Sequence, residues 1–160
     1  MGRWLLLHLG RGGFDDRKLL SAARIDEMHT PAARTADQAD TDRKVPKAPI
    51  TLYGLGWFVN THAGKTVVEH SGVQNGFVCW MALMPQEGLG VVILSNHHQT
   101  GINLALRSWV FDKLLGQPER DWSTIVREDY ANGWQRLLRE AKVTGRLWPR
   151  VTRFKNETTD

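Results

Sequence analysis

The chain has a single cysteine, no long apolar run and little net charge. Cys79 stands alone among 160 residues, so no disulfide can form within the chain and no pair of thiols can bind a metal or carry redox chemistry. No segment approaches the roughly 20 consecutive apolar residues that a membrane helix needs. The 21 basic and 17 acidic residues leave a net charge of +4, a mild excess that does not by itself indicate nucleic-acid binding. These absences exclude a disulfide-stabilised scaffold and a membrane-spanning helix.

The N-terminal segment predicts two short helices. The first ten residues carry a basic residue and a short run of leucines, without the small-residue cleavage site of an export signal. They read as an amphipathic helix that ends at Gly10. Ser21 is a good N-cap for a second helix with Ile25 on its apolar face. Residues 31–50 contain almost no large apolar side chain, so we expect a long loop or a disordered segment there.

Residues 52–96 have the alternating pattern and β-branched composition of strands. Short connections that contain glycine separate them and favour antiparallel neighbours. We expect a four-strand meander with strands over Leu55–Val59, Thr66–Ser71, Phe77–Met84 and Val91–Leu94.

Two further helices are expected after the sheet. The second of them runs from about Ser123 to Val143, with Tyr130 on its apolar face. The first covers residues 101–116 and has an apolar stripe at helical spacing, formed by Ile102, Ala105, Leu106, Trp109, Val110 and Leu114. The expected fold class is therefore α+β, an antiparallel β-sheet flanked by N- and C-terminal helices.

The order of short motifs in the strand region is more informative than any one of them. A bare His-Ser-Gly is more often the end of a strand than a functional site. Here the motifs follow one another as Tyr53-Gly54-Leu55-Gly56-Trp57, His70-Ser71-Gly72, Gly76-Phe77, Met84-Pro85 and Leu94-Ser95-Asn96. In that order the segment resembles the closing part of the serine β-lactamases and penicillin-binding-protein-like hydrolases. It is most similar to the class C β-lactamase and esterase branch, which implies a partial β-lactamase/transpeptidase-like fold.

The resemblance implies roles for four consecutive residues on a strand at the sheet edge. His70 and the hydroxyl of Ser71 would contact the substrate, and the backbone N–H of Val73 would help to form the oxyanion hole. Gly72 would let a substrate lie against the backbone, and an edge N–H can stabilise a developing oxyanion without reorganising. His70 stands where penicillin-recognising members commonly carry lysine. This difference favours an esterase- or peptidase-like relative over an efficient β-lactamase.

The nucleophile of the family is absent from these residues. The family attacks with the serine of S-x-x-K, and no S-x-x-K occurs in the chain. Ser21-Ala22-Ala23-Arg24 imitates it, but arginine does not lose its proton near neutral pH and cannot act as the base, so a helix cap is expected there. Tyr130-Ala131-Asn132 matches the letters of the family's Y-x-N motif but follows the triplet where the family has it earlier, so we expect a core tyrosine. The chain is therefore interpreted as a C-terminal fragment that does not turn over substrate alone.

The sequence gives only weak support for a metal site or a nucleic-acid surface. Adjacent histidines and a lone cysteine lack the paired spacing of zinc ligands, so we expect no metal and no cofactor; the residues concerned are His62, His70, Cys79, His97 and His98. A solvated helix face followed by a frayed tail explains the basic C-terminal residues better than nucleic-acid binding. Those residues are Arg136, Arg139, Lys142, Arg146, Arg150, Arg153 and Lys155.

We therefore expect residues 1–116 to be the C-terminal part of a β-lactamase-like domain and residues 117–160 to be a helical extension with a basic tail. The partners implied by the resemblance are a small-molecule ester, amide or β-lactam substrate and a missing N-terminal half. Members of the family are often exported or periplasmic, and the sequence itself does not reveal the compartment. Two other hypotheses stay open: a non-catalytic binding or regulatory domain that reuses the fold, and an anion or nucleic-acid binder that acts through the tail.

Overall fold

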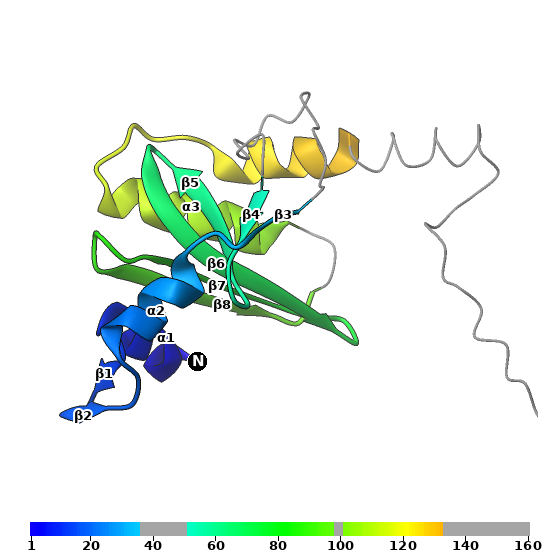
Figure 1. Ribbon diagram of the computed structural model, residues 1–160. Helices are drawn as coiled ribbons and strands as arrows, with labels where there is room; N and C mark the ends of the chain where they lie inside the picture. Colours follow the sequence, from blue (N-terminus) through cyan, green and yellow to red (C-terminus); the bar gives the residue numbers. More distant parts are fainter. Residues whose placement is uncertain (36–50, 98–100, 133–160) are drawn as a thin grey trace, which may run out of the picture.

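A six-stranded antiparallel sheet forms the centre of the protein (Figure 1). The computed structural model describes residues 1–35, 51–97 and 101–132. Each strand of the sheet pairs with its neighbours in chain order. The strands are β3 (Ala33–Thr35), β4 (Thr51–Tyr53), β5 (Phe58–His62), β6 (Lys65–Gln74), β7 (Phe77–Met84) and β8 (Leu89–Ser95). A separate two-stranded ladder joins β1 (Gly13–Phe14) to β2 (Arg17–Lys18).

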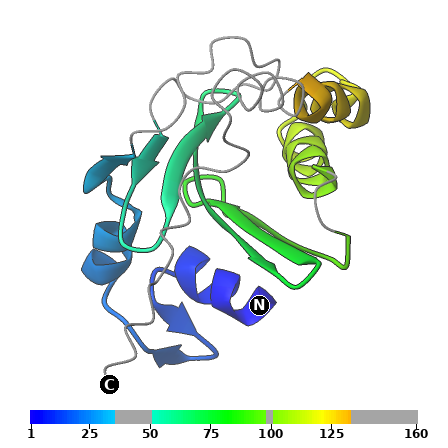
Figure 2. The ribbon, with the colours of Figure 1, turned by 90° about the vertical axis from the view of Figure 1, so that its right-hand side faces the viewer.

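Helices cover both faces of this sheet (Figure 2). One face packs against the N-terminal helices α1 (Gly2–Leu9) and α2 (Ala22–His29). The other face packs against α3 (Ile102–Leu114), which is followed by a helix over residues 122–132. The expected α+β class, an antiparallel sheet flanked by N- and C-terminal helices, is confirmed.

The N-terminal helices begin and end where their capping residues predict. The N–H of Gly10 donates to the carbonyl of Leu6 at 2.7 Å at the end of α1. The Ser21 hydroxyl accepts a hydrogen bond from the Arg24 N–H at 3.3 Å, so Ser21 is the N-cap of α2. The apolar side chain of Leu5 from α1 then packs in the core of the sheet. Ser21 therefore has the structural role that the sequence assigned to it.

Two histidines, one from α1 and one from α2, lie against each other. His8 is 1% exposed, and its Nδ1 lies 2.9 Å from Nε2 of His29. The His8 ring also meets the rings of Trp4 and Trp57 edge to face, at centroid distances of 4.7 and 4.9 Å. Its Nε2 is buried and has no hydrogen-bond partner within the described part of the chain. Burial, and then the charge of His29, lower the pKa of His8 from 6.5 to about 4.

The sheet contains strands that the apolar pattern did not predict. Within the segment expected to be a loop, residues 33–35 form β3 and pair with β4; residues 36–50 of that segment lie outside the described part. The expected start of the next strand at Leu55 was also wrong, although a strand does precede the turn after His62. The N–H of Gly54 donates to the carbonyl of Trp57 at 2.8 Å to close a turn, and β5 begins only at Phe58. Backbone pairing rather than side-chain alternation decides these short elements.

Strand β6 has two halves with different surroundings. It pairs with β5 from Lys65 to Glu69 and with β7 from Val68 to Gln74. Val68 and Glu69 therefore pair on both sides, whereas the last five residues pair with β7 alone among the described residues. The β6–β7 hairpin turns at Asn75-Gly76, which both have positive φ, as a two-residue type I′ connection requires.

Most of the apolar stripe predicted for α3 lies outside its buried face. Ile102, Leu106, Trp109 and Leu114 are exposed by 38 to 57%. The buried side chains of the helix are instead Asn103, Ala105, Arg107, Ser108, Phe111 and Asp112. Charged residues can lie on this buried face because each of them is paired with a buried partner.

A buried carboxylate on β6 accepts hydrogen bonds from three side chains. Glu69 Oε2 accepts hydrogen bonds at 3.0 Å from Arg107 Nε of α3 and at 3.0 Å from Trp80 Nε1. Its Oε1 accepts from Asn60 Nδ2 at 2.7 Å. The pair of Glu69 and Arg107 is desolvated, with side chains 7% and 6% exposed. This ion pair joins the sheet to α3.

A second buried carboxylate joins α3 to the helix that follows it. Asp112 accepts hydrogen bonds of 2.6 Å from His62 Nε2 and from Trp122 Nε1. Burial, as the largest cause, lowers the pKa of His62. Trp122 is 3% exposed and packs with Ala105 and Val126. The beginning of the 122–132 helix is thus fixed on α3; residues 133–143 of the helix expected up to Val143 lie outside the described part.

Candidate functional site

The His-Ser-Gly triplet lies in the half of β6 that pairs on one side only. His70, Ser71, Gly72 and Val73 are opposite Met81, Trp80, Cys79 and Val78 of β7. The ladder with β5 ends at the pair of Phe58 and Glu69. In the described part of the chain, no strand pairs with the other side of β6 beyond that point.

The hairpin register decides which backbone groups face this free edge. A two-residue hairpin is closed by residues that exchange both hydrogen bonds, here Gln74 and Phe77. Backbone groups alternate sides along a strand, so those of Gly72 and Gln74 face β7. The N–H groups of Ser71 and Val73 therefore point to the free edge. Val73 N–H has the orientation that an oxyanion-hole donor needs, and its role there stays a prediction.

The side chains of the triplet do not converge on one point. Cross-strand pairing places His70 beside Met81, which packs on the core of the α1 face. Ser71 faces the opposite side of the sheet and borders a pocket with the first turn of α3. Adjacent residues of a strand point to opposite faces, a constraint that three neighbouring letters in a motif do not reveal. The backbone at the free edge of β6 is therefore the part of the triplet that can be reached from both faces of the sheet.

His70 is held by protein groups at both of its ring nitrogens. Its Nδ1 lies 2.7 Å from the carbonyl oxygen of Ser71. Since a carbonyl only accepts, Nδ1 carries the proton, and in the neutral ring Nε2 accepts the Tyr53 hydroxyl at 3.1 Å. The imidazole also stacks on Phe58 at a centroid distance of 5.2 Å. Sequence reasoning gave Tyr53 no role; the only signal was its place at the head of the Tyr-Gly-Leu-Gly-Trp motif.

Gly72 has a packing reason to be glycine. A Cβ placed on it would lie 3.0 Å from the Sγ of Cys79 on the facing strand. The half-buried cysteine thus occupies the space that a larger side chain would need. A serine or alanine at this position would require the Cys79 side chain to move by a few tenths of an ångström.

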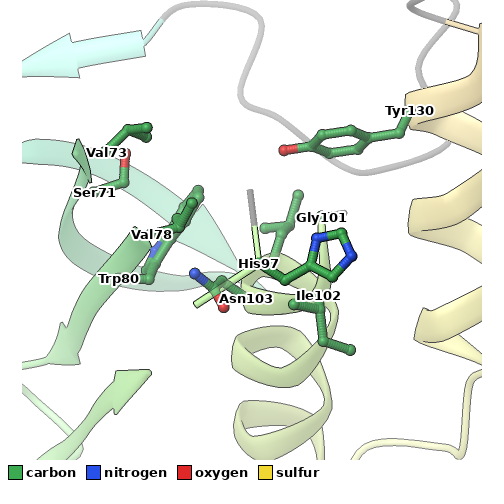
Figure 3. A pocket seen from close by; sticks show the side chains of 10 residues that line it. Ser71, Val73, Val78, Trp80, His97, Gly101, Ile102, Asn103 and Tyr130 are labelled. Atoms are coloured by element: carbon green, nitrogen blue, oxygen red, sulfur yellow. The ribbon is translucent and has the colours of Figure 1, made fainter. Parts of the chain in front are cut away.

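A pocket of about 180 Å³ opens beside the free edge (Figure 3). Ser71 and Val73 lie on one side of it, and Tyr130 of the 122–132 helix lies across from them. Asn103, 4% exposed, also lines it, and its Oδ1 has no hydrogen-bond partner among the residues that the structure describes. The expectation of a core tyrosine was wrong, because Tyr130 is 36% exposed and its ring borders the pocket.

The remaining candidate residues are spread over the molecule. His62 belongs to the buried pair with Asp112, and His97 is exposed at the border of the pocket. Within residues 1–35, 51–97 and 101–132, no group of three or more His, Cys, Asp and Glu side chains could hold a metal ion. His98 and the basic residues of the tail lie outside those ranges. None of the helices described is both long and apolar enough to cross a membrane.

Comparison with known proteins agrees with this architecture. A family model described as Beta-lactamase matches residues 1–114. Among solved structures, the chain is similar to the octameric penicillin-binding protein homologue from Pyrococcus abyssi, with a TM-score of 0.56 and 21% sequence identity. The match covers 71% of this chain and 23% of that chain, so this chain spans less than a quarter of that protein's length. No curated protein matches the chain significantly.

The resemblance drawn from the ordered motifs is therefore confirmed at the level of the family. The structural likeness supports the same fold, and the placement in the class C and esterase branch stays a prediction. Because the family model matches well over half of its residues, the chain belongs to the Beta-lactamase family.

Proposed function

We propose that this chain carries the substrate-binding wall of a serine hydrolase that cleaves an ester, an amide or a β-lactam through an acyl-enzyme. The nucleophile and its lysine would come from a segment outside these 160 residues, which contain no S-x-x-K. The chain alone would then bind substrate without turning it over.

The observation that carries the proposal is the free edge of β6 at Ser71 and Val73. An acyl-transfer transition state places negative charge on the former carbonyl oxygen, and a fixed backbone N–H stabilises that charge without reorganisation. On the opposite side of β6, the backbone groups of Gly72 and Gln74 pair with β7 and fix the strand in place. Val73 N–H is therefore pre-oriented as a donor.

His70 and Tyr53 support this edge in the proposal. The 2.7 Å hydrogen bond from His70 Nδ1 to the Ser71 carbonyl occupies the edge acceptor beside the proposed donor. The Tyr53 hydroxyl fixes the other ring nitrogen at 3.1 Å. His70 would then act as a positioning residue for the strand, and the Ser71 hydroxyl would be the polar side chain of the triplet that is open to a ligand.

Expression of the chain alone, and together with its in-frame upstream coding sequence, tests the proposal. We expect no turnover of a chromogenic ester or a chromogenic cephalosporin by residues 1–160, and turnover of at least one when the upstream segment supplies S-x-x-K. In the active form, Val73→Pro removes the edge N–H without breaking the ladder with β7. We expect it to lower kcat by about 100-fold, as the loss of one oxyanion-hole donor does.

A matched control uses the neighbouring position. Gln74→Pro removes an N–H that faces β7, so its effect should appear as lost stability in urea. Turnover by the lone chain that disappears in Ser71→Ala would refute the need for an external nucleophile. If no upstream segment encodes S-x-x-K and the chain binds ligands as a stable monomer, the hydrolase proposal fails and a non-catalytic binding domain takes its place.

A further inference from the structure

The helix over residues 122–132 lies beyond the segment matched by the family model, which ends at residue 114. It nevertheless reaches the candidate site. In Figure 3 the ring of Tyr130 extends from this helix, with its hydroxyl end towards the side of the pocket formed by Ser71 and Val73. A residue outside the family match thus completes a wall beside the proposed oxyanion edge.

Side-chain contacts fix the 122–132 helix in place and thereby position the Tyr130 ring. Trp122 donates its indole N–H to the buried Asp112 at 2.6 Å, and Val126 is 1% exposed one turn later. The Asp121 side chain accepts the Thr124 N–H at 3.0 Å at the beginning of the helix. An indole anchor, a cap and a buried valine together fix the direction of the helix.

Gly101 brings the beginning of α3 directly against the same helix. A Cβ on Gly101 would lie 2.5 Å from Val126 Cγ1 and 2.7 Å from Tyr130 Cε2. Gly101 also has φ of +66°, which other residues rarely adopt. The backbone of Gly101 therefore lies close to one side of the Tyr130 ring and leaves that side little room to move.

The lining of the pocket specifies the chemistry of its ligand. Its walls are mainly apolar, from Val73, Val78, Trp80, Ile102 and the Tyr130 ring. No carboxylate, lysine or arginine lines it among the described residues. The volume of about 180 Å³ is close to that of cavities that accommodate one benzene ring. Polar groups from Ser71, His97, Asn103 and Tyr130 stand around that space and can orient an attached polar group.

We propose that Tyr130 is a specificity-determining residue, which holds a neutral, ring-sized apolar group of the substrate beside Ser71 and Val73. The proposal rests on the proposed hydrolase function for the identity of the ligand as a substrate, and it names the acyl or leaving group that this face of the site prefers. The pocket itself can be tested without catalysis.

The binding test uses residues 1–160 with benzamide as the probe and acetamide, which lacks the ring, as its control. Backbone amide NMR shifts should report benzamide at Val73, Val78 and Ile102, with no comparable response to acetamide. Tyr130→Ala should weaken benzamide binding by about tenfold, because one aromatic wall is lost. Tyr130→Phe should stay within about twofold, since the ring remains.

Trp109→Ala is the matched control, because Trp109 is an aromatic residue of α3 that is 45% exposed and does not border this pocket. It should leave benzamide affinity unchanged. If Tyr130→Ala does not fold, nuclear Overhauser contacts between benzamide and the Tyr130 ring in the unmodified chain decide the question. Their absence, or an unchanged affinity in a folded Tyr130→Ala, would overturn the proposal.

Kinetics separate the failure of this proposal from that of the hydrolase function. In the active form, Tyr130→Ala should raise KM about tenfold for a phenylacetate ester and leave KM for the matching acetate ester unchanged, with kcat preserved for both. If Tyr130→Ala hydrolyses both esters with the same KM ratio as the unmodified enzyme, the role of Tyr130 is refuted and the hydrolase function is not. Benzamide binding at the pocket without any hydrolysis in the presence of S-x-x-K would refute the hydrolase function while the pocket stands.

Discussion

Mild acid should destabilise this chain through His8. The ring is 1% exposed, packed between two tryptophans, and its pKa is lowered from 6.5 to about 4. A group whose pKa is lower in the folded than in the unfolded state binds fewer protons when folded. Its contribution to stability is therefore full above pH 6.5, decreases as the pH falls, and is lost below about pH 4.

The size of the effect follows from the shift. Each pKa unit corresponds to about 1.4 kcal/mol, so the whole interval from 6.5 to about 4 represents about 3 kcal/mol. Between about pH 7 and about pH 5, a range above the ordinary titration of carboxylates, the His8 share of the loss is about 2 kcal/mol. Burial also lowers the pKa of His29 and of His62, so both add a loss in the same direction. Asp26 opposes the shift of His29 and is itself paired with Arg11 at 2.6 Å.

Urea unfolding across this pH range measures the effect. His8→Phe keeps an aromatic ring against the tryptophans and removes the titration, so its loss of stability from about pH 7 to about pH 5 should be smaller by about 2 kcal/mol. Because burial is the first cause of the shift, the difference should persist in about 0.5 M salt, which would screen exposed charges. An identical pH dependence in the two proteins would refute the reasoning.

Three further predictions concern the buried carboxylates and a helix cap. Glu69→Gln leaves the Arg107 charge in the interior without its counter-ion, and urea unfolding should show a loss of about 3 to 5 kcal/mol, against less than 1 if the pair were solvated. Asp112→Asn weakens the acceptor of the Trp122 indole, so limited proteolysis should cut the 122–132 segment faster while the sheet resists. Ser21→Ala removes the cap of α2 and should cost about 1 kcal/mol in thermal unfolding, and an unchanged midpoint would show that the cap contributes nothing.

The architecture was largely predictable because strong local signals agreed with the fold. The N-cap of α2 at Ser21 and the hairpin at Asn75-Gly76 were readable from residue types alone. Strand β3 was not, since residues 33–35 have no apolar alternation and are ordered by pairing with β4. A strand that depends on a partner for its backbone hydrogen bonds leaves a weak pattern of its own.

Helix α3 shows a second limit of sequence patterns. Its most apolar stripe is exposed, whereas Arg107 and Asp112 are 5% exposed. Hydrophobic periodicity treats a charged residue as a marker of the solvent face. The partners that make burial possible, Glu69 and His62, lie 38 and 50 residues earlier in the chain. No local window could have connected them.

The sequence predicted the order of the candidate residues along the strand. It did not predict the directions in which their side chains point. The motif placed the triplet and Val73, the proposed edge donor, next to each other, and the structure has all four residues in one half of β6. The opposite directions of the His70 and Ser71 side chains follow from the strand period of two. Tyr130 came from a helix that the motif does not include, so its ring at the pocket needed the tertiary structure.

The free edge of β6 has a consequence for how such sites change during evolution. The proposed oxyanion donor at position 73 belongs to the peptide backbone, so every amino acid except proline would present the same N–H. The Val73 side chain, 57% exposed, can therefore vary without altering that hydrogen bond. Two relatives could share the same oxyanion donor and have no letter in common at this position, so divergence there would not signal a lost activity.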